Sequence, residues 1–311
     1  MRALLLAALL APAPALAAPG ESAAPFLLIA PGARPAALGG AFGAVADDAH
    51  AAWYNPAGLG FLEKSEVAAG RESRFAGTRY DYAVVAAPLL AFTDAPRRRN
   101  AAGVAALSLY SLAASGIERR GLVESDAPSG SFGATDRAYA ASYGWAPGGQ
   151  RGAAFGGTVK SVQTTLDSAR ASAFTADLGF LYKGERWSVG GGGRNLVGAI
   201  GYGGAKDPLP RVLFAGAAAR LGRELRVSAD ASMPRDAGLG LAAGAEWTRE
   251  FGKTLAGSLR AGADLSRRDL GALAVLSLGG GVRWGPAEVS AAWRPGGELG
   301  DAFSWSLSAR F

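Results

Sequence analysis

Residues 302–311 read Ala-Phe-Ser-Trp-Ser-Leu-Ser-Ala-Arg-Phe, a run in which apolar side chains alternate with small or polar ones. In a β-strand, successive side chains point to opposite faces of the sheet. One face of this run therefore carries Phe303, Trp305, Leu307, Ala309 and Phe311. The other face carries three serines and Arg310. An apolar face backed by a polar one is typical of a strand that has lipid on one side and a polar lumen on the other.

The same alternation recurs along most of the chain. From about residue 65 onward, runs of roughly nine to fifteen residues alternate in this way, and turn residues separate them. About fourteen runs begin near residues 65, 79, 100, 135, 151, 171, 185, 209, 223, 238, 253, 271, 286 and 302, and those near 100 and 209 alternate poorly. Bacterial single-chain barrels have an even number of strands. The pattern predicts an all-β fold, a transmembrane antiparallel β-barrel of about 14 strands.

The connections between the runs also favour a barrel. Every second connection is a short turn, most of them with glycine, at residues 147–150, 183–185, 222–223, 251–252 and 285; residues 93–100 are the exception. The intervening connections are often longer, above all residues 115–135 and 198–208. This alternation is typical of short periplasmic turns and longer outer loops.

Aromatic residues near the ends of the runs predict girdles at the membrane interfaces. They are Tyr80, Tyr82, Tyr110, Trp145, Tyr182, Trp187, Trp247, Trp284, Trp293 and Trp305. The alternative is a soluble β-sandwich with these aromatics in its core. A sandwich of this length would need two domains, and the sequence shows no linker between them.

The N-terminus predicts export. Arg2 precedes a short apolar stretch at residues 3–10, and the small residues ending at Ala17 suit signal-peptidase cleavage. We therefore predict a signal peptide at residues 1–17, a hatch segment at residues 18–64 and the barrel at residues 65–311. A membrane anchor is the alternative for the first segment. The predicted location is the bacterial outer membrane.

Composition excludes several kinds of chemistry. The chain has no cysteine and one histidine, so thiolate, zinc-finger and two-histidine metal sites are impossible. Its formal net charge of +6 comes from scattered Lys and Arg residues, which does not favour a nucleic-acid partner. A catalytic triad needs a positioned base, and His50 is the only histidine. We expect no enzyme activity, no cofactor and no metal.

Residues 26–64 do not alternate, and they are too apolar for a free tail. Asp47 or Asp48 is expected to cap a short helix over residues 49–54. Asn55 is expected to cap a second helix, with Pro56 at its first position. A compact apolar segment ahead of a barrel predicts a plug inside the lumen, here called the hatch.

This segment resembles the N-terminal signature of the PorV/PorQ branch of FadL-like outer-membrane proteins. The resemblance rests on Gly32-Ala33-Arg34, Leu38-Gly39-Gly40-Ala41-Phe42, Val45-Ala46-Asp47-Asp48 and Trp53-Tyr54-Asn55-Pro56-Ala57-Gly58-Leu59. Later stretches resemble the branch as well, at residues 132–136, 194–198, 207–210 and 297–300. The resemblance implies a fourteen-stranded barrel plugged by an N-terminal hatch. FadL relatives pass hydrophobic compounds through the barrel wall, and PorV relatives bind cargo in type IX secretion.

Two groups of residues are candidate sites. The hatch or gating candidates are Asp47, Asp48, His50, Asn55, Pro56 and Ala57. The lumen-facing charged candidates are Arg194, Arg226, Asp230, Glu246, Arg260 and Asp264, and the same reasoning places Arg71, Asp177, Glu288, Arg294 and Arg310 in the lumen. Both signs occur, so these charges can pair across the lumen or with the hatch; a polar permeation path is the alternative. Asp47 and Asp48 have too few carboxylate neighbours in sequence for calcium, so helix capping is expected.

Two functions remain open. A channel for hydrophobic small molecules predicts an apolar pocket between hatch and wall, and a lateral opening at a kinked strand. A secretion-associated barrel that binds cargo or partner proteins predicts an ordered outer platform from residues 115–135 and 198–208. The expected partners are outer-membrane lipid, lipopolysaccharide and, through the strand ending at Phe311, the barrel assembly machinery.

Overall fold

The computed structural model describes residues 22–90, 100–121, 126–202 and 204–311. The predicted signal peptide lies outside the described residues, as does most of the exceptional connection at residues 93–100. No helix in these described ranges is long and apolar enough to cross a membrane.

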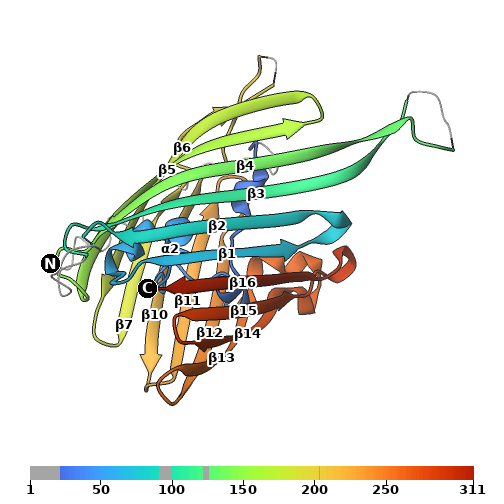
Figure 1. Cartoon of the computed structure of the whole chain (residues 1–311). Coiled ribbons are helices and arrows are strands. Elements are labelled where there is room, and N and C mark those ends of the chain that lie inside the picture. Colours follow the sequence, from blue (N-terminus) through green and yellow to red (C-terminus); the bar gives the residue numbers. More distant parts are fainter. Residues whose placement is uncertain (1–21, 91–99, 122–125, 203) are drawn as a thin grey trace, which may run out of the picture.

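Fourteen antiparallel strands close into a barrel, as the alternation predicts (Figure 1). Each strand pairs with its neighbours along the chain, and β1 pairs with β16 to complete the ring. The strands are β1 (Glu66–Ser73), β2 (Arg79–Pro88), β3 (Val104–Arg119), β4 (Gly130–Trp145), β5 (Gly152–Leu166), β6 (Ala169–Lys183), β7 (Trp187–Arg194), β10 (Val212–Leu221), β11 (Leu225–Pro234), β12 (Gly240–Phe251), β13 (Leu255–Asp264), β14 (Leu276–Trp284), β15 (Ala287–Arg294) and β16 (Ala302–Arg310).

The predicted alternation of faces is confirmed in the last strand. Trp305 and Leu307 are 50% and 51% exposed on the outer wall, whereas Ser304 and Ser306 are buried in the lumen. The same division holds around the ring, and the outward side chains form the apolar surface that a bilayer requires. The exposed aromatics include Trp145, Tyr182, Trp187, Trp284, Trp293 and Trp305, as expected for interfacial girdles.

The aromatic prediction is wrong for three tyrosines. Tyr80, Tyr82 and Tyr110 are buried on the lumen side of β2 and β3. Tyr110 lies 4.4 Å from Trp53 of the hatch, measured between ring centroids. Lumen-facing positions next to the hatch are buried like those of a protein core, so aromatic rings there pack inside the barrel.

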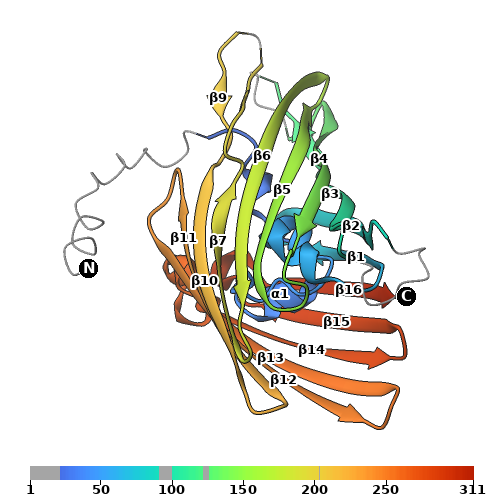
Figure 2. The same ribbon diagram turned by 90° about the vertical axis from the view of Figure 1, so that its left-hand side faces the viewer.

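Four neighbouring strands are longer than a membrane needs. β3 and β4 have 16 residues each and β5 and β6 have 15, whereas tilted membrane strands need roughly 9–11. Figures 1 and 2 show these strands projecting past the rest of the barrel. Since this end also carries most of the longer loops, it is the outer mouth. The loop between β7 and β10 adds a two-stranded sheet, β8 (Ala199–Ile200) and β9 (Asp207–Pro208).

One strand begins later than predicted. The run expected from about residue 271 starts at Leu276, because residues 265–275 form the short helices η6 (Leu265–Leu270) and η7 (Ala272–Val275). Asp264 caps η6 by accepting a hydrogen bond from the Ser266 N–H, which turns the chain away from β13. Two further short helices, η4 (Phe75–Gly77) and η8 (Gly297–Leu299), lie in other outer loops.

The segment that precedes β1 lies inside the barrel (Figure 2). It contains η2 (Pro25–Leu28), α1 (Ala33–Ala37), α2 (Ala51–Tyr54) and η3 (Pro56–Phe61). α1 packs against β13 to β16, and η3 packs against β3 to β6 on the other side of the lumen. Because Phe26, Phe42 and Trp53 are almost fully buried, the hatch forms the hydrophobic core that an empty barrel would lack.

Candidate functional site

Asn55 joins three parts of the structure through one buried side chain. Its Oδ1 accepts a hydrogen bond from the Ala57 N–H at 3.3 Å, which caps η3 as predicted. Its Nδ2 donates to the carbonyl oxygen of Gly43 at 2.8 Å and to that of Phe180 in β6 at 3.0 Å. The side chain has no measurable exposure. It therefore links η3, another hatch segment and the barrel wall.

The wall is lined with glycine where η3 meets it. Gly144, Gly156 and Gly179 are paired across β4, β5 and β6 and face the lumen. A Cβ atom at Gly156 would collide with the backbone of residues 56 and 57, and one at Gly179 would collide with Asn55 Oδ1. The Asn55-Pro56-Ala57 stretch thus lies backbone to backbone against the wall, a contact that only glycine permits.

A second hatch segment, residues 41–45, crosses the lumen and is called the septum here. Four side chains hold its backbone. Asp230 accepts from the Gly43 N–H at 2.7 Å, and Asn55 donates to the Gly43 carbonyl. The hydroxyls of Ser188 and Ser228 donate to the carbonyls of Ala44 and Ala41 at 2.7 and 2.8 Å. The septum is therefore tied to β7, β11 and the start of η3.

The septum separates two cavities. The outer cavity, about 730 Å³, lies between the hatch and strands β10 to β13 near the outer mouth. The inner cavity, about 280 Å³, is bordered by the short turns at the opposite mouth. Gly43 lines the outer cavity and Val45 lines the inner one. Along β10, Phe214 faces the outer cavity and Ala218 the inner one, about 13 Å of strand apart.

The two cavities differ in chemistry. Apolar side chains, among them Leu28, Val212, Phe214 and Leu241, contribute much of the outer cavity, and Arg194 and Asp230 are among its polar groups. The inner cavity is polar and basic. Its lining includes Arg151, Lys183, Arg186, Arg220 and Arg226 against Asp47 and Glu185.

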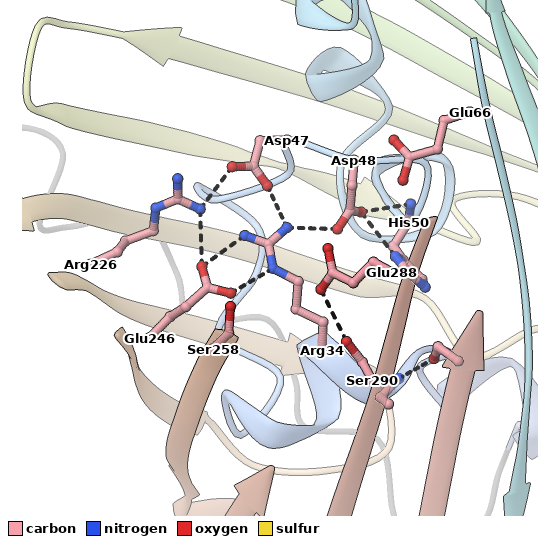
Figure 3. Close-up of polar contacts among 12 residues, drawn as sticks. Arg34, Asp47, Asp48, His50, Glu66, Arg226, Glu246, Ser258, Glu288 and Ser290 are labelled. Atoms are coloured by element: carbon pink, nitrogen blue, oxygen red, sulfur yellow. Dashed lines mark hydrogen bonds and ion pairs between the residues drawn. The ribbon is translucent and has the colours of Figure 1, made fainter. Parts of the chain in front are cut away.

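An ion-pair network fixes the hatch to the inner half of the barrel (Figure 3). Arg34 forms a two-pronged contact with Glu246 of β12, both hydrogen bonds being 2.8 Å. Arg34 Nη1 also lies 2.7 Å from Asp47 and 2.6 Å from Asp48. Arg226 of β11 pairs with Asp47 at 2.7 Å, and Arg260 of β13 pairs with Glu246 at 2.8 Å.

The expected capping role is wrong for Asp47, whereas Asp48 accepts from the N–H two residues on, in the turn that leads into α2. α2 begins after His50 and has no side-chain cap. Asp47 instead bridges Arg34 and Arg226, and Asp48 accepts from the His50 N–H at 2.9 Å. Burial alone would raise the pKa of Asp47, but Arg226 and Arg34 hold that pKa well below its usual range. Hydrogen-bonded ion pairs with two guanidinium groups stabilise the Asp47 carboxylate more than a helix cap would. These ion pairs therefore determine where the Asp47 side chain lies.

His50 continues the hatch contacts to the other side of the barrel. Its Nδ1 lies 2.9 Å from Asp48 Oδ1, and its Nε2 lies 2.8 Å from the hydroxyl of Tyr82 in β2. That hydroxyl is hydrogen-bonded to Ser306 of β16 at 2.8 Å. His50 is 5% exposed, so it acts as a buried polar link from the hatch to β2 and, through the Tyr82 hydroxyl, to β16.

One buried ion pair was missed from the sequence. Lys160 of β5 and Asp177 of β6 are fully buried and lie 2.7 Å apart. The ammonium group also lies 3.0 Å from Asn195 Oδ1 and 4.7 Å from the ring centre of Trp53. The tight turn between β5 and β6 fixes Lys160 opposite Thr175, diagonal to Asp177. The register of this hairpin could have indicated the Lys160–Asp177 pair from the sequence.

Arg34 and Arg71 also differ from expectation. Arg34, which was not a candidate, is central to the network. Arg71, expected in the lumen, faces outward beside Trp305 and pairs with Asp81 at 2.6 Å. The reason is that Glu72 takes the inward position, where it is buried and accepts from Ser304 at 2.8 Å.

The other lumen candidates fall into three groups. Arg226, Glu246, Arg260 and Glu288 belong to the network, and Arg194, Asp230 and Asp264 border the outer cavity. Arg294 and Arg310 pair with Glu72 and Glu66 of β1. The guanidinium of Arg194 lies 5.6 Å from the centre of the Phe214 ring. Within the described ranges, no group of three or more His, Asp or Glu residues is arranged to hold a metal ion.

Comparison with known proteins identifies the fold. No protein-family model matches the chain, and no curated protein matches it. Among solved structures, the toluene transporter TbuX of Ralstonia pickettii matches with a TM-score of 0.58 at 13% identity, over 92% of this chain and 100% of TbuX. The chain has the fold of the FadL-like outer-membrane barrels.

Two further structures support that assignment of the FadL-like fold. The Pseudomonas putida toluene transporter TodX has a TM-score of 0.53 at 14% identity, over 90% of this chain and 97% of TodX. A Pseudomonas aeruginosa FadL homologue has a TM-score of 0.53 at 10% identity, over 90% and 98% of the two chains. A closed barrel of this fold with an apolar outer wall is a protein of the bacterial outer membrane.

Proposed function

We propose that this protein is a passive outer-membrane channel for hydrophobic small molecules, with the hatch as its gate. The observation that carries the proposal is the septum, five residues that separate an outer cavity from an inner one. The proposal involves no enzymatic step and no cofactor. Asn55, Pro56, Ala57, Asp47, Asp48 and His50 would set the position of the gate.

The outer cavity suits an apolar ligand. Its volume of about 730 Å³ lies within the roughly 300–1,000 Å³ of small-molecule sites. Phe214, Leu241 and Val212 would contact the body of the ligand. TbuX and TodX, which share the fold, are toluene transporters, so monoaromatic hydrocarbons are sensible first probes.

The septum is held to the wall by side chains and not by strand pairing, so it can move while the barrel stays closed. Four hydrogen bonds fix its backbone to side chains of Asp230, Asn55, Ser188 and Ser228. At about 1 kcal/mol net for each bond, breaking these four alone would cost on the order of 4 kcal/mol. Phe42 of the septum is also fully buried, so an opening movement has to keep that ring packed against Tyr54.

A reversible crosslink tests this gate directly. The chain has no cysteine, so Ala44→Cys/Ser188→Cys introduces the only thiols, at a place where the Ser188 hydroxyl lies 2.7 Å from the carbonyl oxygen of Ala44. Uptake of radiolabelled toluene is measured in cells that express the variant, before and after oxidation. Oxidation should reduce uptake to the empty-vector rate, and dithiothreitol should restore it. Undiminished uptake in a fully crosslinked sample would refute gating by the septum.

A second candidate is a secretion-associated barrel of the PorV/PorQ type. It is favoured by the projection of β3 to β6 beyond the membrane and by the small β8–β9 sheet in an outer loop. Together these could form a platform for a protein partner. Deleting the gene and comparing secreted proteins with toluene uptake separates the two: a changed secretome with normal uptake supports this candidate instead.

A further inference from the structure

Six polar side chains form a compact patch on the outer wall of the projecting strands. In register, Arg137 of β4 lies beside Gln163 of β5, which lies beside Ser172 of β6. One step nearer the outer end, Thr135, Thr165 and Arg170 form a second row. Alternation places all six on the lipid side of the wall rather than in the lumen. This patch is called the polar grid below.

The polar grid borders a cleft and carries two unpaired cations. Its six residues line a depression of about 580 Å³. Arg137 and Arg170 are exposed, and neither forms an ion pair or a side-chain hydrogen bond with any residue that the structure describes. The grid itself contributes no carboxylate, so its net charge is positive.

The polar grid begins where the apolar wall ends. Directly beneath it, the next outward row contains Tyr139 and Phe174, which are 44% and 71% exposed. Outward side chains continue through Val159 and Leu178 to Trp145 near the inner mouth. Arg137 lies eight residues from Trp145 along β4, which is roughly 20 Å of height for a tilted strand. The second row, with Thr135 ten residues from Trp145, lies at roughly 25 Å by the same measure. Since the apolar band of such barrels is roughly 25 Å tall, the grid lies at the upper edge of that band, where the outer-leaflet headgroups begin.

On the neighbouring strands β1 to β3, the outer wall at the same height carries an acidic residue. Across the register, Arg137 lies beside Ser111, which lies beside Asp81. There, Asp81 pairs with Arg71 at 2.6 Å and with Arg79 at 2.9 Å, so that the protein supplies its own anion. The polar grid has no equivalent acid. An anion bound by the grid would therefore have to come from outside the chain, and the lipid headgroup layer adjoins it.

We propose that the polar grid binds a phosphoryl group of an outer-leaflet glycolipid of the lipid A type. Two guanidinium groups can donate to the phosphoryl oxygens. Hydroxyl and amide groups of Thr135, Gln163 and Ser172 are placed to contact the sugar. The adjoining rings of Tyr139 and Phe174 offer apolar contact to the acyl chains.

Lipid titration by native mass spectrometry tests the proposal on the full-length barrel in detergent. The probes are bisphosphorylated lipid A, the same lipid after enzymatic dephosphorylation, and inorganic phosphate. Arg137→Gln/Arg170→Gln is compared with Arg223→Gln/Arg249→Gln, which makes the same charge change at exposed positions near the inner mouth. Heat-modifiable migration on gels confirms that each variant is folded.

Binding of bisphosphorylated lipid A should fall about tenfold or more in the grid variant and stay unchanged in the inner-mouth variant. Dephosphorylation of the lipid should produce a similar loss in the wild type. Equal binding by wild type and grid variant would overturn the proposal. So would competition by millimolar inorganic phosphate as strong as that by lipid, or a change of oligomeric state in the grid variant, since these identify a free-anion site or a contact between copies.

Discussion

The side-chain amide of Asn55 donates to the carbonyl oxygen of Gly43 across 2.8 Å, and so connects the cap of η3 to the middle of the septum. The same nitrogen donates to Phe180 of the wall at 3.0 Å. One side chain therefore sets both the position of the Asn55-Pro56-Ala57 stretch and that of the segment between the two cavities. If the septum moves, either the hydrogen bond from Asn55 to Gly43 breaks or Asn55 moves with the septum.

Replacing Asn55 with alanine should loosen the septum. The change removes two hydrogen bonds to buried carbonyls, at a cost of about 2 kcal/mol. Only the bond to Gly43 holds the septum, and its loss of about 1 kcal/mol should raise toluene uptake about fivefold if opening of the septum limits transport. The measurement is initial uptake in cells with matched amounts of folded barrel.

Asn100 provides the control for that substitution. It is also buried, and its Nδ2 donates to a hatch carbonyl, that of Gly60, at 3.0 Å. However, it makes no contact with the septum. Asn100→Ala should therefore leave uptake within about twofold of the wild type. A similar increase in both variants would show that general loosening of the hatch, and not the Asn55–Gly43 contact, controls passage.

A methyl group on the wall should displace the hatch. At Gly156 an added Cβ would collide with the backbone of Ala57, whereas at Gly157, which faces outward, its nearest neighbour would be 3.5 Å away. Gly156→Ala should therefore destabilise hatch docking by about 1–3 kcal/mol, and Gly157→Ala should have no such effect. Limited proteolysis of residues 22–64 in the folded barrel reports the difference. Equal resistance of the two variants would mean that the wall accommodates the methyl group.

The barrel was predictable because each strand contacts two different surroundings. Along β16, Trp305 meets lipid and Ser306 meets the hatch, so the residue types record the two faces. Where the surroundings are less distinct, the prediction failed. β1 reads Glu-Val-Ala-Ala-Gly-Arg-Glu-Ser, and nothing in that run shows that Glu72 rather than Arg71 faces inward. The outer helix η7 was likewise hidden, because residues 272–276 form an apolar run that suits a strand.

The functional core was predictable in part. Asn55 and Pro56 carry their local signal, a cap followed by proline, and the structure has that cap. Asp47 carries a similar signal but forms ion pairs instead, because Arg34 and Arg226 reach it from elements 13 and 179 positions away in the chain. Partners at such separations leave no trace in a local pattern. Pairing across the lumen has to be read from the fold.

The contribution of Asp47 to hatch stability should be lost only at low pH. Burial would raise the pKa of Asp47, but Arg226 and Arg34 outweigh burial and lower it below the roughly 3.9 of an unfolded chain. The carboxylate therefore stabilises the folded state fully above about pH 4–5, and that contribution is lost as the pH falls through the lowered pKa. The difference in hydrogen exchange of the hatch between wild type and Asp47→Asn, after correction for intrinsic rates, should be the same at pH 7 and pH 5.

Asp47→Asn identifies the source of that dependence. At pH 7 the variant should lose about 3 kcal/mol of hatch stability, because two guanidinium groups lose a charged partner. The gap between wild type and variant should close under strongly acidic conditions, where both carry a neutral side chain. Asp81→Asn, at a more exposed pair on the outer wall, should change stability by less than about 1 kcal/mol. A constant gap at all pH values would show that Asp47 acts through packing rather than charge.

Removing only the cation of the Lys160–Asp177 pair should reduce the free energy of unfolding more than removing both charges. Lys160→Met keeps the bulk of the side chain but leaves the Asp177 carboxylate buried without its cation, which should cost about 3–5 kcal/mol. Lys160→Met/Asp177→Asn removes both charges and keeps an acceptor for the Asn195 N–H, which now binds Asp177 at 2.8 Å. Urea unfolding of the refolded barrel, followed by gel mobility, should show the double variant recovering at least half of the loss. If the double variant is less stable than Lys160→Met alone, the ion pair does not compensate the burial of its charges as the 2.7 Å contact indicates. The hydrogen bond from the Asn195 N–H to Asp177 then carries the stability instead.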